Sequence, residues 1–164
     1  MTATVQISMA RPGDAVEIAD MSRRLIEHGL PWSWRPERVA RSIAARNTNV
    51  AVVREQGVLV GFGIMEYWDE DAHLVLFAVR RESRRRGIGT AILHWLEASA
   101  RVAGSERIRV ECRRANAAAR CFYNEHGYHE LSIRQRMYGG ADAGIYLEKR
   151  LRGLVTPGPS GGDS

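Results

Sequence analysis

The sequence predicts a mixed α/β fold, an α+β layered single domain whose mostly antiparallel sheet of six or seven strands is flanked by four helices. The first observation is the order of strand and helix patterns, β-α-α-β-β-β-α-β-α-β-β, which combines hairpins with helical crossovers. The second is the length of 164 residues, which favours one domain with one core. We expect the domain to cover residues 1–152. Residues 153–164 are rich in Gly, Pro and Ser, so we expect a disordered C-terminal tail.

The N-terminal part predicts one strand and two helices. Residues 2–8 alternate weakly between apolar and polar side chains, which indicates the first strand. Asp14 is a candidate N-cap residue, and Glu17 follows three positions later, as in a capping box. Gly29 is a suitable stop for this helix, and Pro36 opens the second helix.

Three strand patterns and then a long helix follow. The strands are predicted over residues 49–54, 58–68 and 73–79. Residues 55–57 and 69–71 are predicted turns. The helix is predicted over residues 87–103, with a buried stripe made of Ile88, Ile92, Trp95, Ser99 and Val102.

The C-terminal part predicts a strand, a helix and a last pair of strands. Charged and apolar residues alternate over 107–112, which indicates a half-buried strand. Residues 116–125 form the next predicted helix, and Gly127 ends it. The last two strands are predicted over residues 130–138 and 144–149.

Composition favours a protein of the cytoplasm. Hydrophobic residues make up 45% of the chain and charged residues 26%, as in ordinary globular proteins. There is no signal-peptide pattern and no long apolar run, so we expect no membrane partner. Cys112 and Cys121 do not form a C-x-x-C motif, which favours reduced thiols in a cytosolic protein.

The positive charge is carried almost entirely by arginine. There are 24 basic and 19 acidic residues, and Lys149 is the only lysine. Arginine residues cluster at 80–86, at 107–114 and at positions 134 and 136. The planar guanidinium suits phosphates and carboxylates. The clusters are compatible with a pocket for a polyanionic small molecule, with a nucleic-acid surface or with a solvated surface.

A basic, glycine-containing loop precedes the long helix. Backbone N–H groups at a helix N-terminus and glycines that allow close approach make an anion site, and pyrophosphate is the natural ligand. A dinucleotide-binding loop would have Gly or Ala at the position of Ile92. A Walker loop would have Lys directly after a glycine, and neither Gly87 nor Gly89 is followed by Lys. These two classes of nucleotide site are therefore disfavoured.

Two motifs resemble those of the GNAT superfamily of N-acetyltransferases. Arg84-x-x-Gly87-x-Gly89 resembles its acetyl-CoA signature, Q/R-x-x-G-x-G/A. Residues 116–128 resemble its second motif, which has an Asn, an Ala-rich helix, an aromatic-Tyr pair, a Gly and an aromatic residue. The resemblance is specific over residues 74–128. It implies a GNAT-like domain that moves the acetyl group of acetyl-CoA, its cosubstrate, onto an amine.

The same resemblance implies the site residues. Phe77 and Val79 match the strand whose backbone holds the pantetheine arm, Asn116 matches the side chain that contacts this arm, and Tyr123 matches the general acid. The residues that match the pyrophosphate arm are Arg84, Arg85, Arg86, Gly87, Ile88, Gly89 and Thr90.

The general base stays open at this point. On a regular strand His73 shares a face with Phe77 and Val79, and some family members have a carboxylate there. Glu66 on the preceding strand, Asp71 near the turn, and water alone are the alternatives. We expect no metal, because His126-x-x-His129 has no further ligands at a suitable spacing.

The acceptor stays open as well. Residues 136–151 are similar to the end of the ribosomal-protein alanine acetyltransferases, which implies the N-terminal α-amine of a protein as one acceptor. A small-molecule amine, including an aminoglycoside, and a non-catalytic acyl-CoA-binding module are the alternatives. Trp32 and Trp34 could stack on an acceptor or pack between the first two helices. We expect no nucleic-acid partner, and a homodimer through strands near residues 138–147 is possible.

Overall fold

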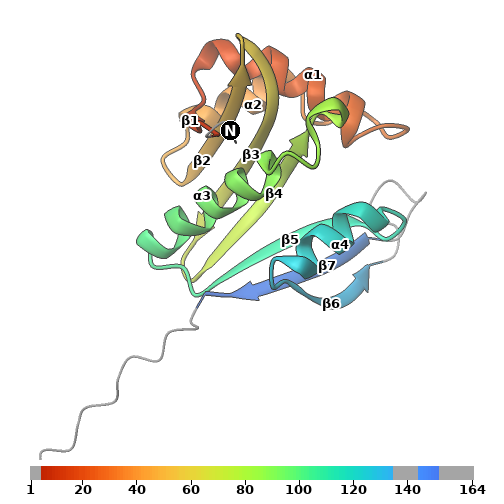
Figure 1. Cartoon of the computed structure of the whole chain (residues 1–164). Coiled ribbons are helices and arrows are strands. Elements are labelled where there is room, and N and C mark those ends of the chain that lie inside the picture. Colours follow the sequence, from red (N-terminus) through yellow and green to blue (C-terminus); the bar gives the residue numbers. More distant parts are fainter. Residues whose placement is uncertain (1–4, 135–143, 152–164) are drawn as a thin grey trace, which may run out of the picture.

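A seven-stranded sheet with the order β1-β2-β3-β4-β5-β7-β6 forms the centre of the structure (Figure 1). The computed structural model describes residues 5–134 and 144–151. In chain order the elements are β1 (Ser8–Met9), the 3-10 helix η1 (Pro12–Asp14), α1 (Ala15–Leu25), α2 (Pro36–Ala44), β2 (Thr48–Glu55), β3 (Val58–Trp68), β4 (Asp71–Val79), η2 (Arg81–Ser83), α3 (Ile88–Val102), β5 (Arg107–Arg113), α4 (Ala117–Glu125), β6 (His129–Arg134) and β7 (Gly144–Arg150). The β4–β5 pair is parallel and the other pairs are antiparallel, so the predicted fold class and element order are confirmed.

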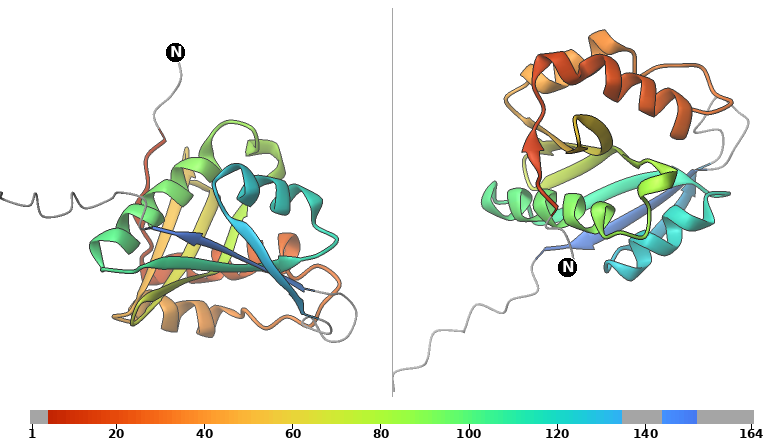
Figure 2. Two further views of the ribbon diagram at one scale, coloured as in Figure 1. Left: turned by 90° about the horizontal axis from the view of Figure 1, so that it is seen from below. Right: turned by 45° about the horizontal axis from the view of Figure 1, so that its top comes forward.

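The helices cover the two faces of the sheet separately (Figure 2). Helices α1 and α2 lie on one face, where Ile18, Trp34 and Val39 join a cluster with Phe62 and Leu76. Helices α3 and α4 lie on the other face. There the buried core consists mainly of Ile92, Leu93, Leu96, Ile108, Val110, Tyr123 and Tyr128.

The buried side of α3 differs from the predicted stripe. Ile88 and Ile92 are buried as expected, but Val102 is 90% exposed. Burial continues through Leu93, Leu96 and Ala100. Sequence periodicity allows either stripe, and the packing of α3 on β2, β3 and β4 selects this one.

Asp14 precedes α1 but does not cap it. Its side chain makes no cap hydrogen bond to α1. Instead its carboxylate accepts the Arg11 N–H at 2.7 Å and pairs with the Arg54 guanidinium at 2.6 Å. Glu17, the other half of the expected capping box, also pairs with Arg54, at 2.8 Å. The acidic pair therefore ties the start of α1 to β2.

Strands β4 and β5 separate after a short parallel contact. Residues 71–74 of β4 pair with residues 107–110 of β5. Beyond Leu74, β4 stays paired with β3 as far as Val79, and β5 stays paired with β7 as far as Arg113. Figure 1 shows the resulting V, which opens toward the start of α3 and toward α4. Within the described residues, the β5-facing edge of β4 thus has no strand partner over residues 75–79.

A β-bulge in β4 changes which face its side chains meet. Ile64 pairs with Leu76 and Met65 with Leu74, so Val75 is an extra residue. Leu74 packs in the cluster under α3, whereas Leu76 packs in the cluster under α1 and α2. Phe77 and Val79 therefore face α3. His73 faces the α1–α2 side, so the expectation that it shares a face with Phe77 and Val79 was wrong.

A buried polar triad joins α3, the start of β6 and β7. Glu97 is 2% exposed, accepts a hydrogen bond from the Tyr128 hydroxyl at 2.9 Å and forms an ion pair with Lys149 Nζ at 3.0 Å. Burial, and then the negative charge of Glu97, raises the pKa of Tyr128 far above its ordinary value, so the phenol stays protonated and donates. The triad uses the only lysine of the chain.

We expect Tyr128→Phe to lower the free energy of unfolding by about 2 kcal/mol, because Glu97 loses a buried donor. Chemical denaturation measures this change. A loss below about 0.5 kcal/mol would show that the hydroxyl adds little to the triad.

The strand order of the sheet limits which strands could pair across the expected dimer. Strand β7 lies between β5 and β6, so its edges are already paired, and β6 is the exposed edge strand. Pairing across a dimer through residues 144–147 is therefore wrong, and a homodimer stays a prediction. Residues 2–4 of the first expected strand, residues 135–138 of a later one, and the tail 153–164 lie outside the described residues. No helix of the described residues is long and apolar enough to cross a membrane.

Candidate active site

The loop between η2 and α3 turns its backbone toward the helix axis. Arg85 has a φ of 63° and Gly87 a φ of 80°, so both residues adopt the left-handed conformation. Left-handed residues before a helix turn successive N–H groups to the same side, where they meet the positive end of the helix dipole. A Cβ on Gly87 would have no atom within 4 Å, so the space beside its backbone is open. This is the geometry of an anion site.

The arginines of the loop do not contribute equally. Arg86 donates to both carboxylate oxygens of Glu55, at 2.9 and 2.6 Å, so much of its charge is neutralised. Arg84 donates from Nε to the Val79 carbonyl at 3.2 Å, which ties the loop to the end of β4. Arg85 is exposed and has no ion pair within the described residues. Arg84 and Arg85 are therefore the side chains whose charge is available to an anion.

Aromatic rings join β4 to α4 beside the helix start. The rings of Phe77 and Phe122 stack with centroids 5.5 Å apart. A Cβ on Gly89 would lie 3.4 Å from Phe77 Cζ and 3.5 Å from the Phe122 ring. Glycine at position 89 thus lets α3, β4 and α4 meet closely.

Thr90 connects the first turn of α3 to the end of α4. His126 Nδ1 lies 2.7 Å from the Phe122 carbonyl, which only accepts, so Nδ1 must carry the proton. In the neutral ring Nε2 therefore accepts from the Thr90 hydroxyl, 3.1 Å away. The Thr90 side chain is thus engaged, and its backbone N–H remains in the first helical turn.

The second motif places Asn116 and Tyr123 at the two ends of α4. Asn116 caps the helix, because its Oδ1 accepts the Ala119 N–H at 3.0 Å. Its amide nitrogen has no partner within the described residues. Tyr123 is 5% exposed, and its ring centroid lies 6.3 Å from that of Phe77 and 5.6 Å from that of Tyr128. The structure therefore brings Tyr123 to the same side of β4 as Phe77.

The sequence-predicted bases lie elsewhere. Glu66 and His73 are register partners on β3 and β4, so the structure brings them together. They lie where β4 and β5 are still paired, whereas Phe77, which Tyr123 contacts, lies beyond that pairing. Asp71 pairs with Arg107 and lies 4.0 Å from Arg109, which holds its carboxylate in an ion-pair network.

Glu111 is an acidic residue that the sequence reasoning missed. It lies on β5 one residue beyond Val110, the last residue of β5 that pairs with β4. It is exposed, and it has no ion pair within the described residues. The alternation of β5 places it on the face opposite Cys112. The available signal was its position five residues before Asn116, within an alternating strand.

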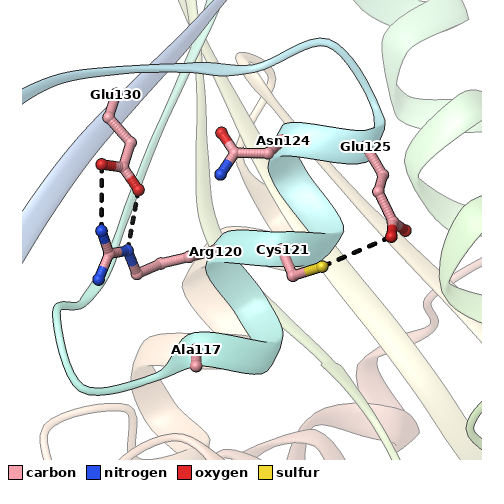
Figure 3. Close-up of a pocket in the computed structure, with 6 residues that line it drawn as sticks. All are labelled: Ala117, Arg120, Cys121, Asn124, Glu125 and Glu130. Carbon is pink, nitrogen blue, oxygen red and sulfur yellow. Dashed lines mark hydrogen bonds and ion pairs between the residues drawn. The ribbon is translucent and has the colours of Figure 1, made fainter.

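A shallow hollow on the outer side of α4 is separate from these residues (Figure 3). Its charges are paired, since Arg120 holds Glu130 at 2.8 and 3.2 Å. The Cys121 thiol lies 3.4 Å from Glu125 Oε1, and this carboxylate raises the pKa of Cys121. The thiol is therefore a poor nucleophile. In the part of the chain that the structure describes, no three His, Cys, Asp or Glu residues cluster as metal ligands.

Comparison with known proteins assigns the class. The model of the acetyltransferase (GNAT) family matches residues 18–128. The chain belongs to this family and is a GNAT N-acetyltransferase, a family that uses acetyl-CoA, so the predicted family and enzyme class are confirmed.

Individual relatives narrow the comparison. The chain is 30% identical to the [ribosomal protein bS18]-alanine N-acetyltransferase of Escherichia coli strain K12 over 115 residues, which are 70% of this chain and 76% of that one. It is 27% identical to N-alpha-acetyltransferase RimI of Mycobacterium tuberculosis over 158 residues, 93% and 96% of the two chains. The crystal structure of the ribosomal-protein-S18-alanine N-acetyltransferase from Escherichia coli matches with a TM-score of 0.77 at 25% identity and covers 90% of this chain and 94% of that one. The chain is a distant homologue of these enzymes.

Proposed function

We propose that this enzyme acetylates the N-terminal α-amine of a protein by direct attack of the amine on acetyl-CoA in a ternary complex. One observation carries the proposal: Tyr123 meets Phe77 beside the point where β4 and β5 part, next to the anion loop of α3. The names of the relatives support the acceptor class, since one is a [ribosomal protein bS18]-alanine N-acetyltransferase and the other an N-alpha-acetyltransferase.

The residues fit acetyl-CoA along its length. The loop of Arg84, Arg85 and Gly87 provides backbone N–H groups and charge for a pyrophosphate. The free edge of β4 over residues 75–79 can pair with the amides of an extended pantetheine arm, as an added strand would. The unpartnered amide nitrogen of Asn116 can donate to the same arm. Bound acetyl-CoA supplies the thioester whose carbonyl the amine attacks.

Two groups of the chain assist this attack. The carbonyl oxygen gains negative charge, which a free backbone N–H of β4 can stabilise. Tyr123 lies beside Phe77, on the stretch of β4 that β5 leaves unpaired, and can give a proton to the departing thiolate. Neither step needs a metal ion or a covalent enzyme intermediate.

Glu111 is the base that the geometry favours. An α-ammonium group with an ordinary pKa of about 8 must lose a proton before it attacks. Glu111 shares the α1–α2 face of the sheet with His73 and Glu66, but it lies beyond the last β4–β5 pair, where the two strands part. Its carboxylate has no ion pair within the described residues. Asp71, by contrast, is held by Arg107.

We expect Glu111→Gln to lower kcat/KM about tenfold at pH 7, because the enzyme then depends on the fraction of acceptor that is already neutral. The deficit should shrink as the pH rises past the pKa of the amine, and a pH profile of CoA release measures this. His73→Gln and Glu66→Gln are the comparison variants. If either lost more activity than Glu111→Gln, the base would belong to the β3–β4 pair.

A screen of acceptors tests the proposed function. Release of CoA is measured with peptides that have free N-termini, with the same peptides N-terminally blocked, and with polyamines and aminoglycosides. Turnover of free peptides alone is the expected result. Turnover of small amines alone would place the enzyme among small-molecule acetyltransferases. Stabilisation by acetyl-CoA, about 2.7 kcal/mol at a hundredfold excess over Kd, without any turnover would indicate a binding module.

A further inference from the structure

Three arginines stack on two tryptophans at the α1–α2 connection. The guanidinium carbons of Arg23 and Arg35 lie 5.1 and 4.6 Å from the centroid of the Trp32 ring. The guanidinium carbon of Arg38 lies 3.8 Å from the centroid of the Trp34 ring. We call these five residues the arginine–tryptophan cluster. Stacking holds the cationic planes in place while their N–H edges stay available to a carboxylate.

A buried carboxylate holds this connection rigid. Glu27, at the end of α1, is 7% exposed. It accepts the Ser33 N–H at 2.8 Å, the Ser33 hydroxyl at 2.7 Å and the Trp34 N–H at 3.2 Å. Ser33 and the backbone of Trp34 are thereby fixed in position, directly after Trp32. A ligand of the cluster therefore meets preorganised donors, which lowers the entropic cost of binding.

The α1–α2 connection lies beside the end of β5, the strand that carries Glu111. Arg113, the last residue of β5, donates from Nη2 to the His28 carbonyl at 3.0 Å. His28 in this connection thus contacts the end of β5, two residues beyond Glu111. Figure 1 shows this connection on the side toward which the V opens. A chain whose first residue reaches Glu111 and Tyr123 would extend past this connection, since an extended chain advances about 3.3 Å per residue.

No carboxylate of the described residues neutralises the charge of the cluster. Arg23, Arg35 and Arg38 are exposed, and none forms an ion pair with any residue in 5–134 or 144–151. By contrast, the neighbouring Arg24 pairs with Asp20 at 3.1 Å. The one buried carboxylate close by, Glu27, is occupied by backbone and hydroxyl donors. Three cations that lie on aromatic rings and have no carboxylate partner among the described residues favour an anionic ligand.

We propose that the arginine–tryptophan cluster binds acidic side chains in the first few residues of the acceptor, so that the enzyme selects proteins with Asp or Glu after the N-terminal residue. This selection rests on the proposed function, because the ligand is the acceptor chain itself. It concerns the acidic side chains of the acceptor, which neither the anion loop nor Tyr123 would contact.

Matched peptides test the selection. Two peptides begin with the same alanine and differ only at positions two to four, which are Asp and Glu in one and Ser and Gln in the other. We expect kcat/KM to be about tenfold higher for the acidic peptide at low salt and the ratio to fall toward one in 0.5 M NaCl. The N-acetylated acidic peptide should also bind about tenfold more tightly than the N-acetylated neutral peptide. Quenching of tryptophan fluorescence measures both affinities.

A double variant locates the effect. Arg35→Glu with Arg38→Glu should reverse the preference, so that the neutral peptide becomes the better acceptor. The control is Arg46→Glu with Arg101→Glu, which changes the net charge equally at exposed positions away from the cluster, after α2 and near the end of α3. The control should keep the acidic preference.

The outcomes separate this inference from the proposed function. If both peptides are acetylated at equal rates, the selection is wrong and the α-amine activity stands. If the control loses the preference as the double variant does, the effect comes from net charge and the cluster is not the site. If no free peptide is acetylated, both proposals fail. Salt-sensitive binding of a single-stranded RNA that the double variant abolishes, with no peptide preference, would assign the cluster to nucleic acid.

Discussion

Gly87→Glu should weaken the binding of acetyl-CoA about a thousandfold. Gly87 has a φ of 80° directly before α3, and the space beside its Cα is open. A carboxylate placed there would face the pyrophosphate at the positive end of the helix. Repulsion between such charges at about 4 Å amounts to about 4 kcal/mol at an effective dielectric constant of 20, which corresponds to about three orders of magnitude in Kd.

Titration calorimetry with acetyl-CoA measures this loss, and Gly104→Glu is its control. Gly104 also has a positive φ, 85°, and open space beside it, but it follows the C-terminal end of α3. The control therefore has similar backbone strain without charge at the anion loop. Equal affinity for acetyl-CoA in Gly87→Glu and in the unmodified protein would show that the pyrophosphate does not bind at this loop.

Tyr123→Phe should lower kcat about a hundredfold while Kd for acetyl-CoA stays within about twofold. The ring, which packs against Phe77, Phe122 and Tyr128, is retained, so the shape of the site is preserved. The hydroxyl, the proposed donor to the thiolate, is lost, and a positioned general acid contributes about 10²–10⁴ in rate.

Tyr128→Phe provides the matched control, since both tyrosines are buried and their rings are in contact. The Tyr128 hydroxyl is bonded to Glu97, so its loss should lower stability and leave kcat nearly unchanged. Single-turnover measurements of CoA release compare the two variants. If kcat fell equally in both, the effect of Tyr123→Phe would be one of packing, and the role of general acid would be lost.

Local patterns accounted for most of the fold. The hairpin between β2 and β3 was predicted at residues 55–57, and it turns at Gln56 and Gly57, which have φ values of 51° and 78°. Pro36 opens α2 as predicted, and the helix predicted from residue 116 begins with Asn116 as its cap. These features depend on a few neighbouring residues, whose backbone preferences act within one turn. Asp14 departed from its pattern because Arg54, forty positions away, competes for its carboxylate.

The position of His73 shows where sequence reasoning was wrong, and the choice of base stays a prediction. His73 was expected on the face of Phe77 because a regular strand alternates with a period of two. The extra residue Val75 shifts that alternation, and the register with β3 shows it. Glu111 was not considered, because its relation to the V depends on where β5 stops pairing with β4. Both facts concern the pairing of distant strands, which no local pattern encodes.

The sequence by itself determined the family and the order of the elements, and it predicted the residues of the anion loop. Glycine at positions 87 and 89 and the Asn116–Tyr123 spacing are local requirements of a backbone that binds an anion and of a helix that presents a tyrosine. Only the tertiary structure decided which charged side chains are paired within the protein and which stay available to a ligand. Glu55 neutralises Arg86, Arg107 holds Asp71, and Arg23, Arg35 and Arg38 find no carboxylate among the described residues. The effect of a charge depends on its partners in space, and these partners lie up to dozens of residues away along the chain.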